Sequence, residues 1–267
     1  MSRSYALAKN FYSPGKCCMI CPREGIVRPL SAPLCVLIVM MVCATRVQGS
    51  VVALSFTKLT GLTGGAISET AVYSADLSSV GLSAILSLTI ADNSAGSGGS
   101  PGQFSGFDLD AVKLSATSCA DAACATGLAG LAVFDFTTAG TFFTPGVQRA
   151  PMDPKLFGTR PDGITVDNTV ATLGDFDGNS TTSIPGALGF LSMGDGGVLS
   201  FNFTSPVSPV GLKLYIGEVG DNGEVAAGRI TVSDTRAEAP EPSSCLLIGT
   251  GLVGLIAATR RRRFHIS

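Results

Sequence analysis

The sequence predicts an all-β protein whose central body, residues 50–236, is an antiparallel β-sandwich of jelly-roll-like type. The 267 residues include 33 glycines and only 14% charged residues, a composition typical of short strands joined by many turns. Little of the sequence has the periodicity of a long amphipathic helix. In VLSFNF, Leu199, Phe201 and Phe203 share one face and the residues between them share the other, as expected for a strand with one side on a core.

Several segments of strand length are expected to form this body, because their side chains alternate between apolar and polar or run apolar. Two sheets packed face to face would bury their apolar faces. The predicted strands are Val51–Leu59, Ala84–Ala91, Gly106–Ala116, Gly130–Thr138, Gly186–Met193, Val198–Thr204, Gly211–Val219 and Gly228–Asp234.

The connections between these segments are polar and rich in glycine. Asp92–Gly102 predicts a flexible loop, and Gly194–Gly197 and Gly220–Glu224 predict turns between strands. The stretch from Pro145 to Pro185 has few strand signals and is longer than an ordinary connection. It is either a functional loop or a region with irregular structure of its own.

Residues 1–49 are predicted to be a signal or targeting segment that contains an N-terminal signal helix. A basic leader precedes the apolar run Leu34–Ala44, and Val47 and Gly49 have the small side chains expected before a signal-peptidase cut. The run is too short for a bilayer core of about 30 Å, which needs roughly 20 residues. A cleaved export signal is favoured over an uncleaved anchor, and a start at Met19 would give it an ordinary length.

The charges and the single histidine exclude several function classes. Between Ser50 and Ala239 there are 18 acidic residues against 8 basic ones, a net charge of −10, which argues against binding nucleic acid. The only histidine, His265, lies in the tail, so the body has no imidazole base for a catalytic dyad or triad. We therefore expect no enzyme. A carboxylate pair acting on carbohydrate is the remaining catalytic alternative. The absence of tryptophan and the presence of only Tyr73 and Tyr215 in the body leave few rings on which a sugar could stack.

The segment GDFDGNS contains a cluster of carboxylates that is a candidate metal site. Asp175, Asp177 and Asn179 alternate, so their oxygens could converge on calcium in a tight loop that Gly178 permits. The favoured alternative is a turn whose side chains bond their own backbone. Asp108 and Asp110 could add ligands from a strand, although such a pair more often marks the solvent face. No cofactor is expected, with calcium as the one possible ion.

Two cysteines of the body are expected to form a disulfide. Cys119 and Cys124 are separated by a spacing that suits the tip of a hairpin, and an oxidising compartment would let them close a small loop. A reduced pair or a metal site is the alternative. Three further cysteines in the leader, within CCMIC, make a poor zinc site because no histidine is near them.

The end of the chain combines three features. Pro240, Glu241 and Pro242 stop the preceding strand, an uncharged apolar segment at about residues 243–259 is long enough for a short transmembrane helix, and four arginines follow. The positive-inside bias places this cluster in the cytoplasm and the body outside. A permanent single-pass anchor is the simplest interpretation. The cluster is Arg260, Arg261, Arg262 and Arg263.

In order, spacing and position, these three features resemble the PEP-CTERM sorting signal of Gram-negative bacteria. The resemblance covers residues 237–267 and implies an exported protein that is held transiently in the inner membrane. It further implies that an exosortase acts near Pro240–Pro242 and releases or transfers the protein to the cell surface or the medium. Such systems usually accompany exopolysaccharide production. The body looks like the β-rich ectodomains found before this signal, and that looser resemblance implies no activity.

Together these features predict a matrix or envelope protein at the cell surface, with a structural or interaction role linked to exopolysaccharide and biofilm. The expected partners are the exosortase, the inner membrane during transit and an exopolysaccharide. One alternative is a calcium-dependent module that binds polysaccharide. The other is a carbohydrate-active enzyme that uses carboxylates alone.

Overall fold

The computed structural model describes residues 49–64, 69–93, 100–178, 189–222 and 229–239. The chain divides into two compact units, Met1–Arg46 and Val47–Ser267, and all described residues belong to the second. The predicted N-terminal signal helix and the predicted transmembrane segment at 243–259 therefore lie outside the described residues. Among the residues that are described, no helix is long and apolar enough to cross a membrane.

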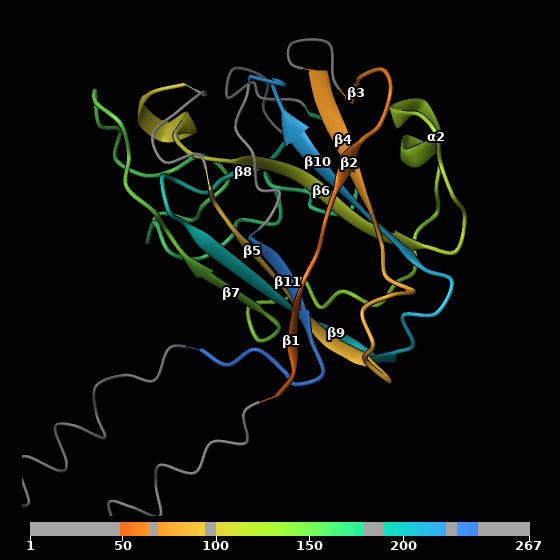
Figure 1. Cartoon of the computed structure of the whole chain (residues 1–267). Coiled ribbons are helices and arrows are strands. Elements are labelled where there is room, and N and C mark those ends of the chain that lie inside the picture. The colour runs from red at the N-terminus through yellow and green to blue at the C-terminus, as the bar shows by residue number, and fades with distance from the viewer. Residues whose placement is uncertain (1–48, 65–68, 94–99, 179–188, 223–228, 240–267) are drawn as a thin grey trace, which may run out of the picture. The chain divides into compact units, whose positions relative to one another are not determined.

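Two antiparallel sheets form the described part of the body (Figure 1). The first, which we call the β9 sheet, has the order β1-β11-β5-β9-β7, and the second, the β10 sheet, has the order β2-β4-β10-β6-β8 with β3 beside β4. The β9 sheet consists of β1 (Val51–Ala53), β11 (Ile230–Ser233), β5 (Ile85–Ala91), β9 (Val198–Val207) and β7 (Thr141–Thr144). The β10 sheet consists of β2 (Thr57–Lys58), β3 (Thr63–Gly64), β4 (Glu69–Asp76), β10 (Lys213–Val219), β6 (Asp108–Ser115) and β8 (Leu191–Ser192).

A hydrophobic core joins the two sheets, as expected for a sandwich. Leu88 and Phe201 of the β9 sheet and Val112 and Ile216 of the β10 sheet are at most 1% exposed and belong to one cluster. The apolar face predicted for β9 is confirmed, because its three alternating residues all lie in this cluster. The β-sandwich predicted from the sequence is thus confirmed for the described body.

The predicted strands need three corrections. Glu69–Asp76 was not predicted but forms β4, beside the central strand β10. The predicted strand Val51–Leu59 divides into β1 and β2, which join different sheets. The predicted strand Gly130–Thr138 does not form, and β7, which follows it, pairs with β9 instead.

The reason for the third correction is that the apolar side chains of this segment enter the core without a backbone ladder. Phe134 packs edge-on against Phe203, and Phe136 packs edge-on against Phe201. The backbone meets β9 in the single bridge between Phe134 and Phe203. Apolar content therefore indicated burial correctly in this segment but indicated the wrong secondary structure.

The long connection after β7 has irregular structure of its own, one of the two expectations. Between residues 145 and 178 the backbone forms no strand, but isolated bridges join Val147 to Asp195, Thr159 to Val166 and Ala171 to Gly189. The last part of this segment lies against the β10 sheet.

Candidate functional site

The β10 sheet has a bulge in β6 that re-aims a carboxylate. The register between β6 and β10 shifts at this point, so that Asp110 and Ala111 together stand opposite Gly217. A bulge changes the direction of the side chains that it carries. Asp110 is fully buried and accepts hydrogen bonds from Thr70 Oγ1 (2.5 Å) and from the backbone N–H of Gly178 (2.9 Å). Asp108 and Asp110 do not lie on a solvent face, and that expectation is corrected.

Residues 172–178 cover this bulge. The backbone N–H of Val112 donates to the carbonyl of Leu173 (2.9 Å). A Cβ atom at Gly217 would lie 2.7 Å from the ring of Phe176, closer than side chains approach each other, so the absence of a side chain lets this ring reach the sheet. The covering segment is thus held by one backbone bond, one buried ring and the carboxylate of Asp110.

The same segment brings a second carboxylate to the bulge. Asp177 Oδ2 accepts from the hydroxyl of Thr172 (2.9 Å), whereas its Oδ1 is buried and has no hydrogen-bond partner. Burial raises the pKa of Asp110 to about 7, and the nearby charge of Asp177 acts in the same direction. Burial also raises the pKa of Asp177.

Two of the three predicted metal ligands, Asp175 and Asp177, lie in the described part of the chain. Asp175 is exposed, and its Oδ1 lies 3.9 Å from the ammonium of Lys113, while Asp177 turns inward towards Asp110. Asn179 lies outside the described residues. Among the residues that are described, no group of three or more histidine, cysteine or acidic residues gathers as metal ligands. Gly178 has the left-handed backbone (φ +49°) that the turn was expected to need.

Lys113 is a buried cation beside this cover. It is 7% exposed, and its ammonium donates to the carbonyls of Thr126 (3.2 Å) and Leu128 (3.1 Å). The ring of Phe176 lies 5.2 Å from the ammonium, within the range of a cation–π contact. A shallow hollow of about 260 Å³ opens next to it and is lined mainly by apolar groups, among them the ring of Phe136.

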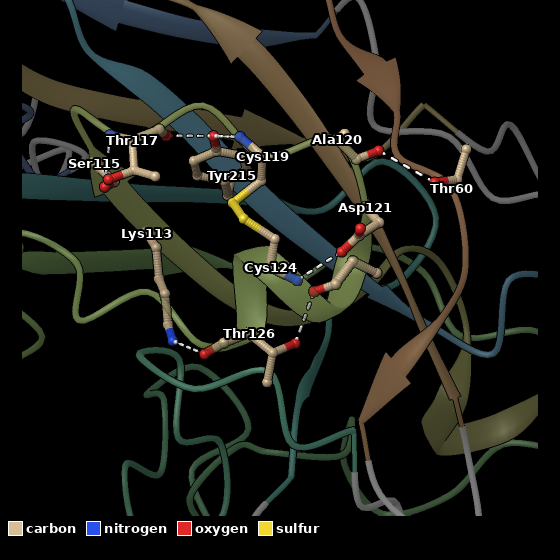
Figure 2. Close-up of a disulfide and its surroundings, with 11 residues drawn as sticks. Thr60, Lys113, Ser115, Thr117, Cys119, Ala120, Asp121, Cys124, Thr126 and Tyr215 are labelled. Carbon is tan, nitrogen blue, oxygen red and sulfur yellow. Dashed lines mark hydrogen bonds between the residues drawn. A yellow bond between two sulfur atoms is a disulfide. The ribbon is translucent and has the colours of Figure 1, made fainter.

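A disulfide closes the other part of the cover (Figure 2). Cys119 and Cys124 are bonded, with 5.5 Å between their Cα atoms. The expected hairpin tip is instead a short helix, α2 (Ala122–Thr126), which Asp121 caps by accepting from the N–H of Cys124 (2.7 Å). This correction has a local cause, since an aspartate at the first position of a short alanine-rich segment favours a helical turn.

The tyrosine of the central strand ties this cover to the sheet. The hydroxyl of Tyr215 donates to the carbonyl of Thr117 (2.7 Å) and accepts from the N–H of Cys119 (2.9 Å), as Figure 2 shows. Its ring is fully buried in a second apolar cluster together with Ala122 and Phe176. Tyr215 is therefore part of the structure and is not available for stacking on a sugar.

At the C-terminal end of the body, the chain crosses the outer side of the β9 sheet. We call residues 234–237 the exit strap. The hydroxyl of Ser87 donates to the carbonyl of Thr235 (2.7 Å). The amide of Asn202 pairs with the backbone of Ala237 twice, through Oδ1 (2.8 Å) and through Nδ2 (3.0 Å). Polar side chains on the outer side of the β9 sheet thus hold the end of the body.

The exit strap also meets the first described residues of the body. The N–H of Ser50 donates to the carboxylate of Asp234 (2.7 Å), and the N–H of Asp234 donates to the carbonyl of Ser50 (3.3 Å). A Cβ atom at Gly49 would lie only 2.3 Å from the side chain of Thr235, so this close approach requires glycine. The start of the described body and the start of the exit strap therefore lie side by side.

The predicted sorting signal, residues 237–267, begins at the last residue of the exit strap. The described chain ends at Ala239, so Pro240, Glu241, Pro242 and the arginine cluster at 260–263 lie outside the described residues. Glu238 and Ala239 are exposed. Two residues thus separate the last strap residue, Ala237, from Pro240.

Comparison with known protein families matches residues 238–263 to the PEP-CTERM protein-sorting motif. Comparison with curated proteins finds no match, and comparison with solved structures finds none. The match begins one residue after the exit strap and contains the Pro-Glu-Pro, the apolar segment and the arginines. The chain therefore carries a PEP-CTERM sorting signal, which marks it as a secreted protein that is sorted by an exosortase.

Proposed function

We propose that this protein is a non-catalytic component of the cell surface or extracellular matrix of a Gram-negative bacterium, delivered through its PEP-CTERM signal and linked to exopolysaccharide. During transit the tail is held in the inner membrane, with the body outside and the arginines in the cytoplasm. The exosortase then acts near Pro240 and frees the body for its final location. The observation that carries this proposal is the match of residues 238–263 directly after the folded body.

The arrangement of the body supports transit through a membrane-held stage. The first described residues of the body meet the start of the exit strap, where Ser50 and Asp234 are hydrogen bonded. An export signal before Ser50 and a membrane segment after Ala239 can then be engaged at one membrane surface without unfolding either sheet. The −10 net charge of the body suits a protein that stays soluble once it is released.

A non-catalytic role is supported by the chemistry of the buried polar groups. Asp110 and Asp177 lie beneath a covering segment and bond Thr70, Gly178 and Thr172, which are structural partners. The body contains no histidine. These carboxylates stabilise the cover and are not presented to a substrate.

The sorting role is tested by replacing Pro240, Glu241 and Pro242 with alanine in the full-length chain. We expect the intact mass of the wild-type protein recovered from cells to lack the apolar segment and the arginines, and the triple variant to retain them. A matched control replaces Ser243 and Ser244, which follow the motif, with alanine and should be processed normally. If the triple variant is processed like wild type, the exosortase assignment is wrong. If mature wild type keeps the tail, the segment is a permanent anchor.

The matrix role is tested separately with the mature protein. We expect it to co-sediment with exopolysaccharide extracted from the producing cells. Heat-denatured protein serves as the control, because folded surface loops are needed for a specific interaction. Equal recovery with and without polysaccharide would contradict the link to exopolysaccharide but would leave the sorting role intact.

A further inference from the structure

The exit strap follows a row of residues that crosses the β9 sheet. Ser233 of β11 pairs with Ser87 of β5, and Ser87 pairs with Asn202 of β9. These positions alternate with core residues, so their side chains lie on the side of the sheet away from the core. The strap leaves β11 after Ser233 and passes over Ser87 and then Asn202, which hold Thr235 and Ala237.

The strap is held by polar contacts and buries little apolar surface. Thr235 and Ala237 are half-buried and Arg236 is exposed. Asn202 is 5% exposed in the docked arrangement, and its amide satisfies both the N–H and the carbonyl of Ala237. Local segments with few apolar contacts open at lower cost than the core of a domain. The strap can therefore detach while the two sheets stay folded.

The docked strap limits the length of backbone before the sorting motif that an enzyme can bind. Glu238 and Ala239 span about 7 Å when extended, at roughly 3.5 Å per residue. Enzymes that act on peptides commonly bind an extended segment through its backbone N–H and carbonyl groups. Those of Ala237 are already taken by Asn202. With the strap docked, only Glu238 and Ala239 lie between the bonded backbone of Ala237 and Pro240.

We propose that the exit strap is a gate on exosortase processing, and that Asn202 and Ser87 are positioning residues that withhold the segment before Pro240. Processing then proceeds through the population in which the strap is detached, and its rate scales with that fraction. This inference rests on the proposed sorting function, because it assumes that the enzyme acts at the Pro-Glu-Pro. It adds that the folded body itself sets how fast the tail is removed.

The gate is tested by pulse-chase of the full-length chain in cells that carry the exosortase, with tail loss followed by mass. Asn202→Ala removes two strap bonds and is expected to raise the processing rate about tenfold. Asn202→Asp keeps the acceptor for Ala237 but loses the donor, so an intermediate rate is expected. The matched control is Thr89→Ala, which breaks a bond to Ser200 (2.8 Å) on the same side of the same sheet without touching the strap.

A second arm changes the reach of the motif without changing the strap. Six glycine and serine residues inserted between Ala239 and Pro240 would give the enzyme free backbone while the strap stays docked. We expect this insertion to speed processing as much as Asn202→Ala, and the two changes combined to add nothing further. Ser87→Ala, which removes one strap bond, gives a milder rate increase and serves if the Asn202 variants fail to fold.

The outcomes separate the gate from the sorting function. If Asn202→Ala, Ser87→Ala and the insertion are all processed at the wild-type rate while alanines at Pro240–Pro242 block processing, the gate is wrong and sorting stands. If Asn202→Ala slows processing, the strap presents the motif instead of withholding it, which also overturns the gate. If the alanine variant at Pro240–Pro242 is processed normally, the sorting function itself fails.

Discussion

The outer sides of the two sheets are covered in different ways. The β10 sheet is covered by the disulfide-closed helix α2 and by residues 172–178, which bury an apolar cluster, a cation and two carboxylates. The β9 sheet carries hydroxyl and amide side chains on its outer side, and the exit strap lies across part of it through hydrogen bonds. Apolar burial and a disulfide hold the first cover, whereas hydrogen bonds hold the exit strap, so opening the first cover should cost more free energy.

The difference between the two covers corresponds to their positions in the chain. The cover of the β10 sheet is internal, so its detachment would expose Tyr215 and Phe176 to water. The exit strap leads into residues 238–263, which must be accessible for sorting. We call the cover of the β10 sheet, formed by α2 and residues 172–178, the firm cover. It lies within the folded body, whereas the exit strap is a weaker cover that directly precedes the segment on which the enzyme acts.

The largest effect is expected from Phe176→Ala, which removes the main apolar contact of the firm cover. The ring is 4% exposed, and its loss should lower the free energy of unfolding by about 3–5 kcal/mol. Urea denaturation of the purified body measures it. The control is Phe142→Ala on the edge strand β7, where Phe142 is half-buried and stands opposite Ser200 in the β9 sheet. If Phe176→Ala and Phe142→Ala lowered the free energy of unfolding equally, the contrast between the covers would be contradicted.

The next effect is a pH dependence that comes from Asp110. Its pKa of about 7 in the folded protein lies above the usual 3.8, so between pH 4 and 7 the folded state binds more protons than the unfolded state. The free energy of unfolding should therefore fall as pH rises through this window, by an amount on the order of 2–4 kcal/mol. Asp110→Asn should flatten this slope, as measured by urea denaturation at several pH values.

The control for this prediction is Asp76→Asn. Hydrogen bonds from Lys213 and Ser78 hold the pKa of the exposed Asp76 carboxyl at about 2. The contribution of Asp76 to the free energy of unfolding is therefore present above the usual pKa of a carboxyl and is lost only as pH falls below that value. This variant should leave the slope between pH 4 and 7 unchanged. An Asp110→Asn protein with the wild-type slope would show that another group titrates in the window.

A smaller loss is expected when the disulfide is removed by changing Cys119 and Cys124 to alanine. The closed loop is short, with a sequence separation of 5, and loops of this length give about 2 kcal/mol. Thermal and urea unfolding measure the loss, and a reductant should lower wild-type stability without affecting the double variant. Because this disulfide belongs to the firm cover, the double variant should lose its tail in cells at the wild-type rate. A changed rate would mean that the two covers are coupled.

The smallest effect is expected from Ser87→Ala, which removes one bond of the exit strap. Hydrogen exchange should show the amide of Ala237 exchanging roughly fivefold faster, because a single neutral bond contributes about 1 kcal/mol. The amide of Gly178, which donates to Asp110 in the firm cover, is the internal control and should not change. Equal acceleration of both amides would indicate general destabilisation and would argue against a separately opening strap.

The sequence predicted the sandwich because strands with one face on the core alternate visibly, as β9 does. Prediction was weakest where both sides of a strand are covered. In β4, Val72 lies under the outer cover and Ala75 lies in the core, so the pattern loses its alternation. In residues 130–138 the opposite happened, because Phe134 enters the core from a segment that has no ladder.

The candidate sites show the same limit. The sorting signal was predictable because its three parts are contiguous in the sequence. Asp110 was considered as a residue outside the Asp175–Asn179 loop, but its burial depends on a bulge that appears only in the register between β6 and β10. Asn202 was not identified, because alternation assigns it to the polar side of β9 and nothing local reveals that the strap covers it. Contacts between residues distant in the chain are not encoded in any single segment.

Because Ser50 and Asp234 are hydrogen bonded, residues 50 and 234 of the body lie next to each other. A polypeptide whose ends meet can be reached through two adjacent attachment points, as an inserted domain is in a host loop. A short peptide would suffice to join residue 234 back to residue 50. The body would then be opened elsewhere, for instance at Gly81, where a Cβ atom would meet no neighbour within 4 Å. Such a permuted body would be a portable unit with its two sheets intact and its sorting tail absent.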